Sequence, residues 1–244
     1  DKLITRRDFL RGTAAAALST SMESGIQESS KSERKAKVIL IRNDKVLDAD
    51  GKPREKVLKD MIDEALKTLL ERDEAVSAWK LLFEPSDIVG IKSNSWAYLP
   101  TPKELETVIT QRLVNLRVSE KYIAADDRGV LNNPVFLRST ALINVRPLRT
   151  HFWSGIGGCI KNYIMFVPNP STYHNDACSD LARIWNLPIV RGKTRLNILS
   201  VLQPQFYGRG PHFFDRRFVW PYKGLLVGTD PVALDAVGAH LLQI

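Results

Sequence analysis

The sequence predicts an α/β fold with a mainly parallel sheet and helices on both faces, built as a single domain or as two tightly packed lobes. Two observations support this prediction. Short β-branched and aliphatic runs alternate along the chain with segments whose apolar residues recur at helical spacing. The chain has 244 residues, of which 44% are hydrophobic and 25% are charged, so it can bury a sizeable core. This composition excludes an intrinsically disordered chain, a collagen-like chain and a polytopic membrane protein.

The first 36 residues are predicted to be a leader and linker outside the fold. The pair Arg6-Arg7 is followed by the apolar Phe9-Leu10 and a short alanine-rich stretch, which resembles a twin-arginine export signal with a cleavage place near Ser19. A frayed basic helix is the alternative. The apolar stretch is too short to span a membrane, so we expect an exported, periplasmic protein with no integral membrane span. Ser, Glu and Lys are then frequent up to residue 36, which is typical of a solvated linker.

Six short apolar runs in residues 37–244 are the predicted strands of the α/β domain. Most are rich in Val, Ile and Leu, and turn-forming or charged residues bound them. They span residues 37–42, 87–92, 122–125, 141–145, 196–202 and 224–228.

Five segments outside these strands are predicted helices, because most of them carry apolar residues at every third or fourth position. Proline suits the first turn of a helix, and Pro53, Thr101-Pro102 and Thr229-Asp230-Pro231 mark three of the starts. The last helix meets no capping residue before Ile244, which leaves open whether the native chain continues. The predicted helices span residues 54–70, 75–83, 101–113, 174–185 and 231–244.

The basic residues are unevenly distributed along the chain. The formal net charge is +8, and residues 140–224 contain 11 Lys and Arg against 3 Asp and Glu, whereas residues 38–139 contain 16 against 17. A nucleic-acid surface is one explanation of such an excess. Because an exported protein rarely meets DNA, we expect no nucleic-acid partner and predict one electropositive pocket for an anionic small molecule.

Polar and charged side chains follow four of the predicted strands. In open α/β sheets, ligands bind outside the carboxyl ends of the strands, so these side chains are expected to meet at one edge of the sheet. The alternative is that the strands simply leave into polar loops. The residues concerned are Lys92, Asn94, Asp126, Asp127, Arg146, Arg149, His151 and Asp230.

Residues 154–162 form a stretch with three glycines shortly before Lys161. Glycines let backbone N–H groups approach an anion closely, and Lys161 adds positive charge. Neither nucleotide-binding fingerprint is present, because Ile160 occupies the position where each needs glycine. A loop that packs tightly against a neighbouring segment is the alternative.

The histidines and cysteines do not form a sequence motif for a metal or a cluster. His151, His174 and Asp230 are weak candidates for a metal site whose ligands converge in the fold. No Cys-x-x-Cys pair is present, so we expect no iron–sulfur cluster to be ligated by this chain, and the cofactor stays unknown. Cys159 and Cys178 are either a disulfide formed in an oxidising compartment or two buried thiols.

Five short motifs, taken in order, resemble the domain-of-unknown-function 362 family. They are residues 91–94, 142–145 and 149–151, Gly155 with Lys161-Asn162, and residues 228–235. The resemblance runs from about residue 37 to the end of the chain, and it implies a fold and a site but no established reaction. Arg149 departs from the lysine that is common in the family, and the Cys clusters of the ferredoxin-like module that many relatives carry are absent. Iron–sulfur chemistry would therefore need a partner protein.

These observations combine into one leading hypothesis, an exported α/β protein that binds an anionic small molecule or cofactor at its strand ends. The resemblance adds a redox-linked enzyme that acts with an iron–sulfur partner protein. The rival hypotheses are a metal-dependent hydrolase or transferase, and a non-catalytic subunit of an exported complex.

The candidate site residues divide by role. Lysine and arginine would hold the anion, asparagine would orient it, and His151 is the candidate acid or base. Asp230 is equally well explained as a helix cap, and the asparagines as turn formers. The predicted catalytic residues are His151, Lys161 and Asp230, and the predicted ligand-binding residues are Lys92, Asn94, Asn144, Arg149, Asn162 and Asp235.

Overall fold

The computed structural model describes residues 35–208 and 214–243. The predicted twin-arginine signal and almost all of the predicted linker therefore lie outside the described residues. From Ala36 onwards the described chain forms one compact unit built on a seven-stranded sheet. Within these ranges, no helix has the length and apolarity needed to cross a membrane.

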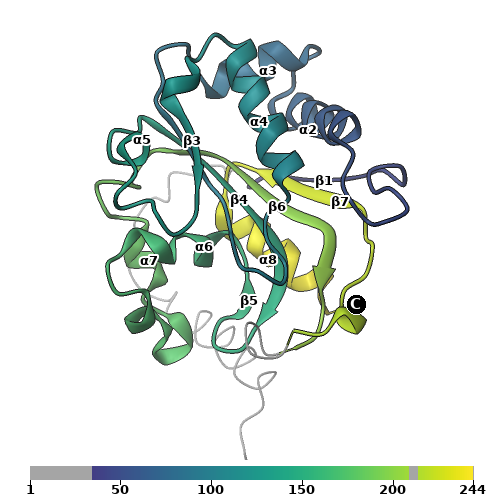
Figure 1. The fold of residues 1–244 in the computed structure, drawn as a ribbon, viewed down its shortest axis with the longest axis vertical. Coiled ribbons are helices and arrows are strands. Elements are labelled where there is room, and N and C mark those ends of the chain that lie inside the picture. The colour runs from purple at the N-terminus through teal and green to yellow at the C-terminus, as the bar shows by residue number, and fades with distance from the viewer. Residues whose placement is uncertain (1–34, 209–213, 244) are drawn as a thin grey trace, which may run out of the picture. The chain divides into compact units, whose positions relative to one another are not determined.

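Four neighbouring strands of the sheet are parallel, and the strand beside them runs the other way (Figure 1). β6, β4, β2 and β3 follow one another in parallel, while β7 is antiparallel to both β6 and the edge strand β1. The short β5 adds an antiparallel pair at the end of β4. The strands are β1 (Val38–Arg42), β2 (Val89–Lys92), β3 (Ile123–Asp126), β4 (Ala141–His151), β5 (Gly155–Gly157), β6 (Thr194–Gln205) and β7 (Gly224–Gly228).

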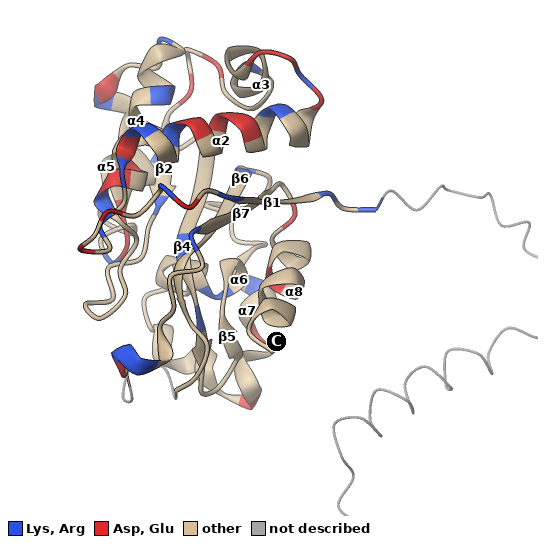
Figure 2. Cartoon of the chain, turned by 90° about the vertical axis from the view of Figure 1, so that its right-hand side faces the viewer, with Lys and Arg blue, Asp and Glu red and all other residues tan. Residues whose placement is uncertain are grey.

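Helices cover both faces of this sheet (Figure 2), which confirms the predicted α/β architecture. On one face α2, α3 and α4 share a core with Ile143, and on the other face Leu142 packs with the short helical turns after β4. These two residues are neighbours on β4 and point to opposite faces, as strand pleating requires. The helices are α2 (Glu55–Leu70), α3 (Ala75–Leu82), α4 (Lys103–Asn115), α5 (Pro134–Leu137), α6 (Cys159–Asn162), α7 (Leu181–Ile184) and α8 (Pro231–Leu241).

All six predicted strands are present. Of the residues predicted to start helices, Asp230 caps its helix and Thr101 does not. Asp230 caps α8, because its carboxylate accepts hydrogen bonds from the backbone N–H groups of Val232 and Ala233 at 2.8 and 3.1 Å. Thr101 does not cap α4. Its hydroxyl instead donates to the carbonyl of Val145 at 3.2 Å, so this side chain ties the loop before α4 to the middle of β4.

The predicted helix over residues 174–185 is wrong. The segment is divided into a 3-10 turn at Asp176–Cys178 and the short α7, after another 3-10 turn at Pro170–His174. Asp176, Ala177 and Cys178 have φ values of 46°, 51° and 66°, a left-handed conformation that ends any right-handed helix. The apolar spacing that suggested a helix arises because Cys178, Leu181 and Ile184 pack into one core from separate turns.

β4 extends six residues beyond its predicted end, and this extension positions the site. Lys92, the last residue of β2, pairs with Asn144, so β4 continues past the point where β2 stops. Arg146 and Arg149 therefore lie on β4 itself rather than in a loop after it. The pairing with β6 shifts register between Pro147 and Arg149. Residues three apart on a regular strand face opposite sides, and the irregularity lets both arginines line one cavity.

Candidate functional site

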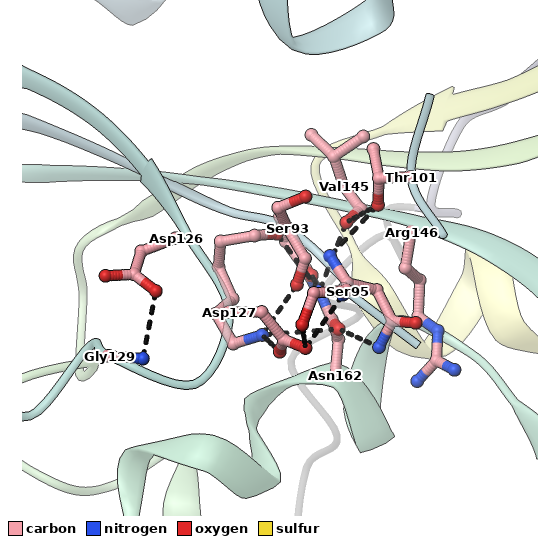
Figure 3. Close-up of polar contacts among 12 residues, drawn as sticks. Ser93, Ser95, Thr101, Asp126, Asp127, Gly129, Val145, Arg146 and Asn162 are labelled. Carbon is pink, nitrogen blue, oxygen red and sulfur yellow. Dashed lines mark hydrogen bonds and ion pairs between the residues drawn. The ribbon is translucent and has the colours of Figure 1, made fainter. Parts of the chain in front are cut away.

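A buried ion pair joins the end of β2 to the loop that follows β3. Lys92 Nζ donates to Asp127 Oδ1 at 2.5 Å and to the carbonyl of Ser93 at 2.6 Å. Ser95 donates to Asp127 Oδ2 from both its backbone N–H, at 2.8 Å, and its hydroxyl, at 2.9 Å (Figure 3). Burial favours a higher pKa for the Asp127 carboxyl, but Lys92 and Ser95 outweigh it and hold that pKa below its ordinary value. The Asp127 carboxylate is thus already neutralised by Lys92.

A chain of asparagine amides connects this pair to α6 and across the sheet. Asn162 Nδ2 donates to the carbonyl of Lys92 at 3.0 Å and to Asn144 Oδ1 at 2.8 Å. Asn144 Nδ2 donates in turn to the carbonyl of Cys159 and to Asn197 Oδ1, both at 3.0 Å. Asn144 is fully enclosed and bonded to protein groups, so it holds α6 against the sheet instead of lining the cavity. Asn162 does both.

Asp235 fixes α6 from the opposite side. From α8, its carboxylate accepts hydrogen bonds from the backbone N–H groups of Cys159, at 2.5 Å, and of Ile160, at 2.9 Å. A side chain at Gly158 would collide with this carboxylate, which explains a glycine directly before α6. Since α6 carries Lys161, Asp235 positions that lysine and also lines a second cavity beside it.

A cavity of about 330 Å³ lies where β4 extends past β2, against α6. Six of the residues singled out from the sequence line it: Asn94, Arg149, His151, Lys161, Asn162 and His174. It is also lined by Trp96 and Arg128, which the sequence did not single out, and by Asp127 and Arg146, which were expected only at the strand ends. No sequence signal marked Trp96, because a lone aromatic residue in a loop has no periodic context.

Asp230 does not join this cavity. β7 runs antiparallel to β6, so its carboxyl end points away from the edge where β2, β3 and β4 end. The expectation that Asp230 meets the other strand-end groups is therefore wrong, since it assumed a parallel strand. The predicted metal candidates do not assemble either: His151 and His174 stack with ring centroids 5.9 Å apart, but Asp230 is elsewhere. In residues 35–208 and 214–243, no three His, Cys, Asp or Glu side chains gather in a way that could hold a metal ion.

Two buried arginines in the cavity have no carboxylate partner in the described part of the chain. Arg146 is 2% exposed; it donates from Nη1 to the carbonyl of Gly158 at 3.2 Å, and Nη2 has no partner. Arg149 is 6% exposed; it donates from Nη1 to Asn94 Oδ1 at 3.2 Å and lies 4.1 Å over the ring of Trp96, while Nε has no partner. Burial lowers the pKa of both guanidinium groups, yet arginine keeps its charge in proteins. These charges are thus buried without an ion pair.

Lys161 adds a third buried cationic group to the cavity, next to two histidines. Its Nζ lies 2.9 Å from His174 Nε2 and 3.9 Å from Cys178 Sγ. Burial lowers the pKa of Lys161 to about 8, and Arg146 and Arg149 contribute by repulsion. Burial, with repulsion from these three cations, lowers the pKa of His151 to about 2, so its imidazole is neutral at physiological pH.

The two cysteines are separate buried thiols. Cys159 and Cys178 are both free, which decides between the two alternatives left open by the sequence. Burial raises the pKa of the Cys159 thiol well above its ordinary value, and the nearby Asp235 carboxylate raises it further. Cys159 is therefore held as an inert thiol.

A comparison with known protein families identifies the family of this chain. A family model described as "Domain of unknown function (DUF362)" matches residues 105–240, more than half of the sequence. The chain belongs to the DUF362 family. The DUF362 match includes the cavity residues Arg146, Arg149, His151, Lys161 and His174, whereas Asn94 and Trp96 precede it. No curated protein and no solved structure matches the chain.

Proposed function

We propose that this DUF362 protein binds a small anion, a carboxylate or phosphate, in the cavity between β4 and α6. The observation that carries the proposal is the uncompensated charge of Arg146 and Arg149, each at least nine-tenths buried. Removing a charge from water costs several kcal/mol unless a partner of opposite sign is present. The cavity's carboxylate, Asp127, is already paired with Lys92. A bound anion supplies the missing negative charge.

The donors suit a planar or tetrahedral oxyanion. Guanidinium groups bind carboxylate and phosphate through paired N–H donors, and Arg146 Nη2 has an unused donor. The Lys161 ammonium adds a third buried positive donor. The backbone N–H of Ser154 points to His151 Nδ1 at 3.4 Å, which assigns the ring hydrogen of the neutral imidazole to Nε2. His151 thus offers a neutral hydrogen-bond donor to the anion.

Export and a redox partner are proposals that rest on the sequence. The Arg6-Arg7 pair supports export by the twin-arginine route, so replacing both arginines with lysine should keep a reporter fused to residues 1–36 inside the cell.

The absence of Cys-x-x-Cys pairs means that iron–sulfur chemistry would come from a separate protein. Co-purification of such a protein with the tagged chain from its native envelope tests this second proposal.

Isothermal titration of the purified protein with sodium oxalate and sodium phosphate, at constant ionic strength, tests anion binding. Arg146→Met and Arg149→Met are each expected to weaken binding about tenfold, because each removes one charged donor (about 1.4 kcal/mol). Arg72→Met, at an exposed arginine just after α2, is the matched control and should bind as the unchanged protein does. No binding of either anion, or equal binding by all variants, would overturn the proposal.

A further inference from the structure

The two buried lysines of the site are in different states. Lys92 is bonded to the Asp127 carboxylate, whereas Lys161 Nζ contacts a histidine nitrogen and a cysteine sulfur. In the described residues, Lys161 forms no ion pair with any carboxylate. An ammonium without a counter-ion loses its proton more easily than a paired one. Lys161 therefore has the surroundings of a reactive amine, and Lys92 those of a structural cation.

His174 is oriented to accept the proton of Lys161. Its Nδ1 lies 3.3 Å from the carbonyl oxygen of Ser171. A carbonyl oxygen accepts only, so Nδ1 carries the hydrogen and Nε2 presents its lone pair to Lys161 Nζ at 2.9 Å. Burial and the nearby ammonium lower the pKa of His174, which keeps this lone pair available.

We propose that Lys161 condenses with the carbonyl group of a 2-oxo acid, whose carboxylate binds to Arg146 and Arg149. This inference rests on the proposed function, because the arginines must hold the carboxylate for the adjacent carbonyl to reach Lys161. The geometry favours this class of anion because the cavity combines carboxylate-binding guanidinium groups with an amine that has no counter-ion.

The chemistry is balanced without an oxidant or a reductant. Neutral Nζ attacks the C2 carbonyl carbon, a C–N bond forms, and the C=O π pair moves to oxygen. One proton of the attacking nitrogen passes through His174 to that oxygen, which gives the carbinolamine. A second proton, from solvent, lets the hydroxyl leave as water while the nitrogen lone pair forms a protonated C=N. His174 Nε2 accepts the proton that Lys161 releases, and His151 Nε2–H is the hydrogen-bond donor for the carbonyl oxygen.

A second cavity, also of about 330 Å³, has room for the substituent of the acid. Lys161 lines both cavities. The second one is walled by apolar side chains that include Ile156, Ile160 and Leu181, besides the polar Ser154 and Ser179. Its charged group other than Lys161 is Asp235, which is occupied by the backbone of α6. A small apolar substituent fits there better than a second carboxylate.

The test is reductive trapping. The full-length protein is incubated with sodium pyruvate and sodium cyanoborohydride, and the modified residue is located by peptide mass spectrometry. The reductant adds hydride to C=N, so the expected product is Lys161 carrying one pyruvic acid less one oxygen atom. Trapping should be suppressed at least tenfold by excess oxalate and by Arg149→Met, which remove the carboxylate site. The trapping rate should rise with pH, with an apparent pKa near 8, because the neutral amine of Lys161 is the nucleophile. The groups that face Lys161 are Arg146, Arg149, His151, His174 and Cys178.

Two variants separate the possible results. Lys161→Arg keeps the charge but cannot form the adduct, so it should bind oxalate and give no trapped product at this position. Lys80→Arg, on the exposed side of α3, is the matched control and should trap as the unchanged protein does. Labelling spread over surface lysines, or equal total labelling of the Lys161→Arg protein, overturns the inference. Oxalate binding without trapping refutes the condensation alone, whereas loss of both refutes the anion site itself.

Discussion

Two arginine sites on the same sheet differ in what balances their charge. Near the start of β6, Arg195 forms two parallel hydrogen bonds with Asp87, from Nη1 at 2.7 Å and from Nη2 at 2.9 Å. Asp87 also accepts from Thr140, so its carboxylate is well satisfied. In β4, from its middle onwards, Arg146 and Arg149 are buried more deeply and have no such partner in the described chain. The first arrangement stabilises the fold, and the second leaves charge available for a ligand.

The charge distribution along the chain agrees with this difference. The acidic residues are numerous in the half of the sequence that contains α2, α3 and α4 (Figure 2), and they pair there with nearby cations, as Asp63 does with Arg112. Residues 140–224, which contain the cavity-lining part of β4 and α6, have three acidic residues against eleven basic ones. The basic excess is thus partly an excess of buried, unpaired groups.

The largest expected effect lies at the paired site. Arg195→Met leaves the Asp87 carboxylate buried without its partner, so we expect a loss of about 2 kcal/mol in the free energy of unfolding. Urea denaturation at pH 7 measures it, and Arg72→Met serves as the control with no change. The loss should shrink on acidification below pH 4. The pKa of Asp87 is lowered in the folded state, so the pair contributes stability above the unfolded value of 3.8 and loses it as pH falls. An unchanged free energy at pH 7 would show that the pair does not stabilise the fold.

Replacing an arginine at the unpaired site should have the opposite effect on the stability of the ligand-free protein. Arg146→Met removes a buried charge that has no partner, so the ligand-free protein should keep its stability or gain about 1 kcal/mol. Oxalate affinity should fall about tenfold in the same variant. Urea denaturation and calorimetric titration of one preparation give both numbers. A stability loss as large as that of Arg195→Met would mean that Arg146 is a structural residue.

The smallest expected effect concerns His151. Its folded pKa, about 2, lies below the ordinary value of 6.5, so between these values the unfolded chain binds one proton more than the folded protein. Stability from this group is fully present above pH 6.5 and falls as pH decreases, by at most about 1.4 kcal/mol per pH unit. His151→Asn should therefore lose less stability than the unchanged protein between pH 6.5 and pH 5.5. His240→Asn, at an exposed histidine at the end of α8, is the control. Parallel pH profiles for all three proteins would contradict the pKa shift.

Local sequence patterns were sufficient to predict most of the fold. The apolar spacing of α2 and the β-branched runs of the strands reflect burial on one face or both, and burial leaves a periodic trace in the sequence. The failed helix at 174–185 shows the limit of this reasoning. Cys178, Leu181 and Ile184 have helical spacing because they reach one core, but three left-handed residues change the backbone path between them.

The site was predicted in its residue types but not in its assembly. Arg149 and His151 were identified because polar residues at strand ends point to ligand binding, and Lys161 because it follows a glycine-containing stretch. The structure brings the three together in one cavity. Asp230 was misplaced because a short apolar strand carries no sign of its direction. Trp96 was missed because its contact with Arg149 joins two segments distant in the sequence.

The sequence by itself determined the α/β class, the order of the elements and the stock of cationic residues, because these depend on local periodicity and composition. Only the tertiary structure decided which cations have partners. The antiparallel direction of β7 removes Asp230 from the site, the register shift at Arg149 turns two arginines into one cavity, and Asp235 and Asn144 hold Lys161 there. Those outcomes follow from contacts between residues far apart in the chain, which no local pattern records.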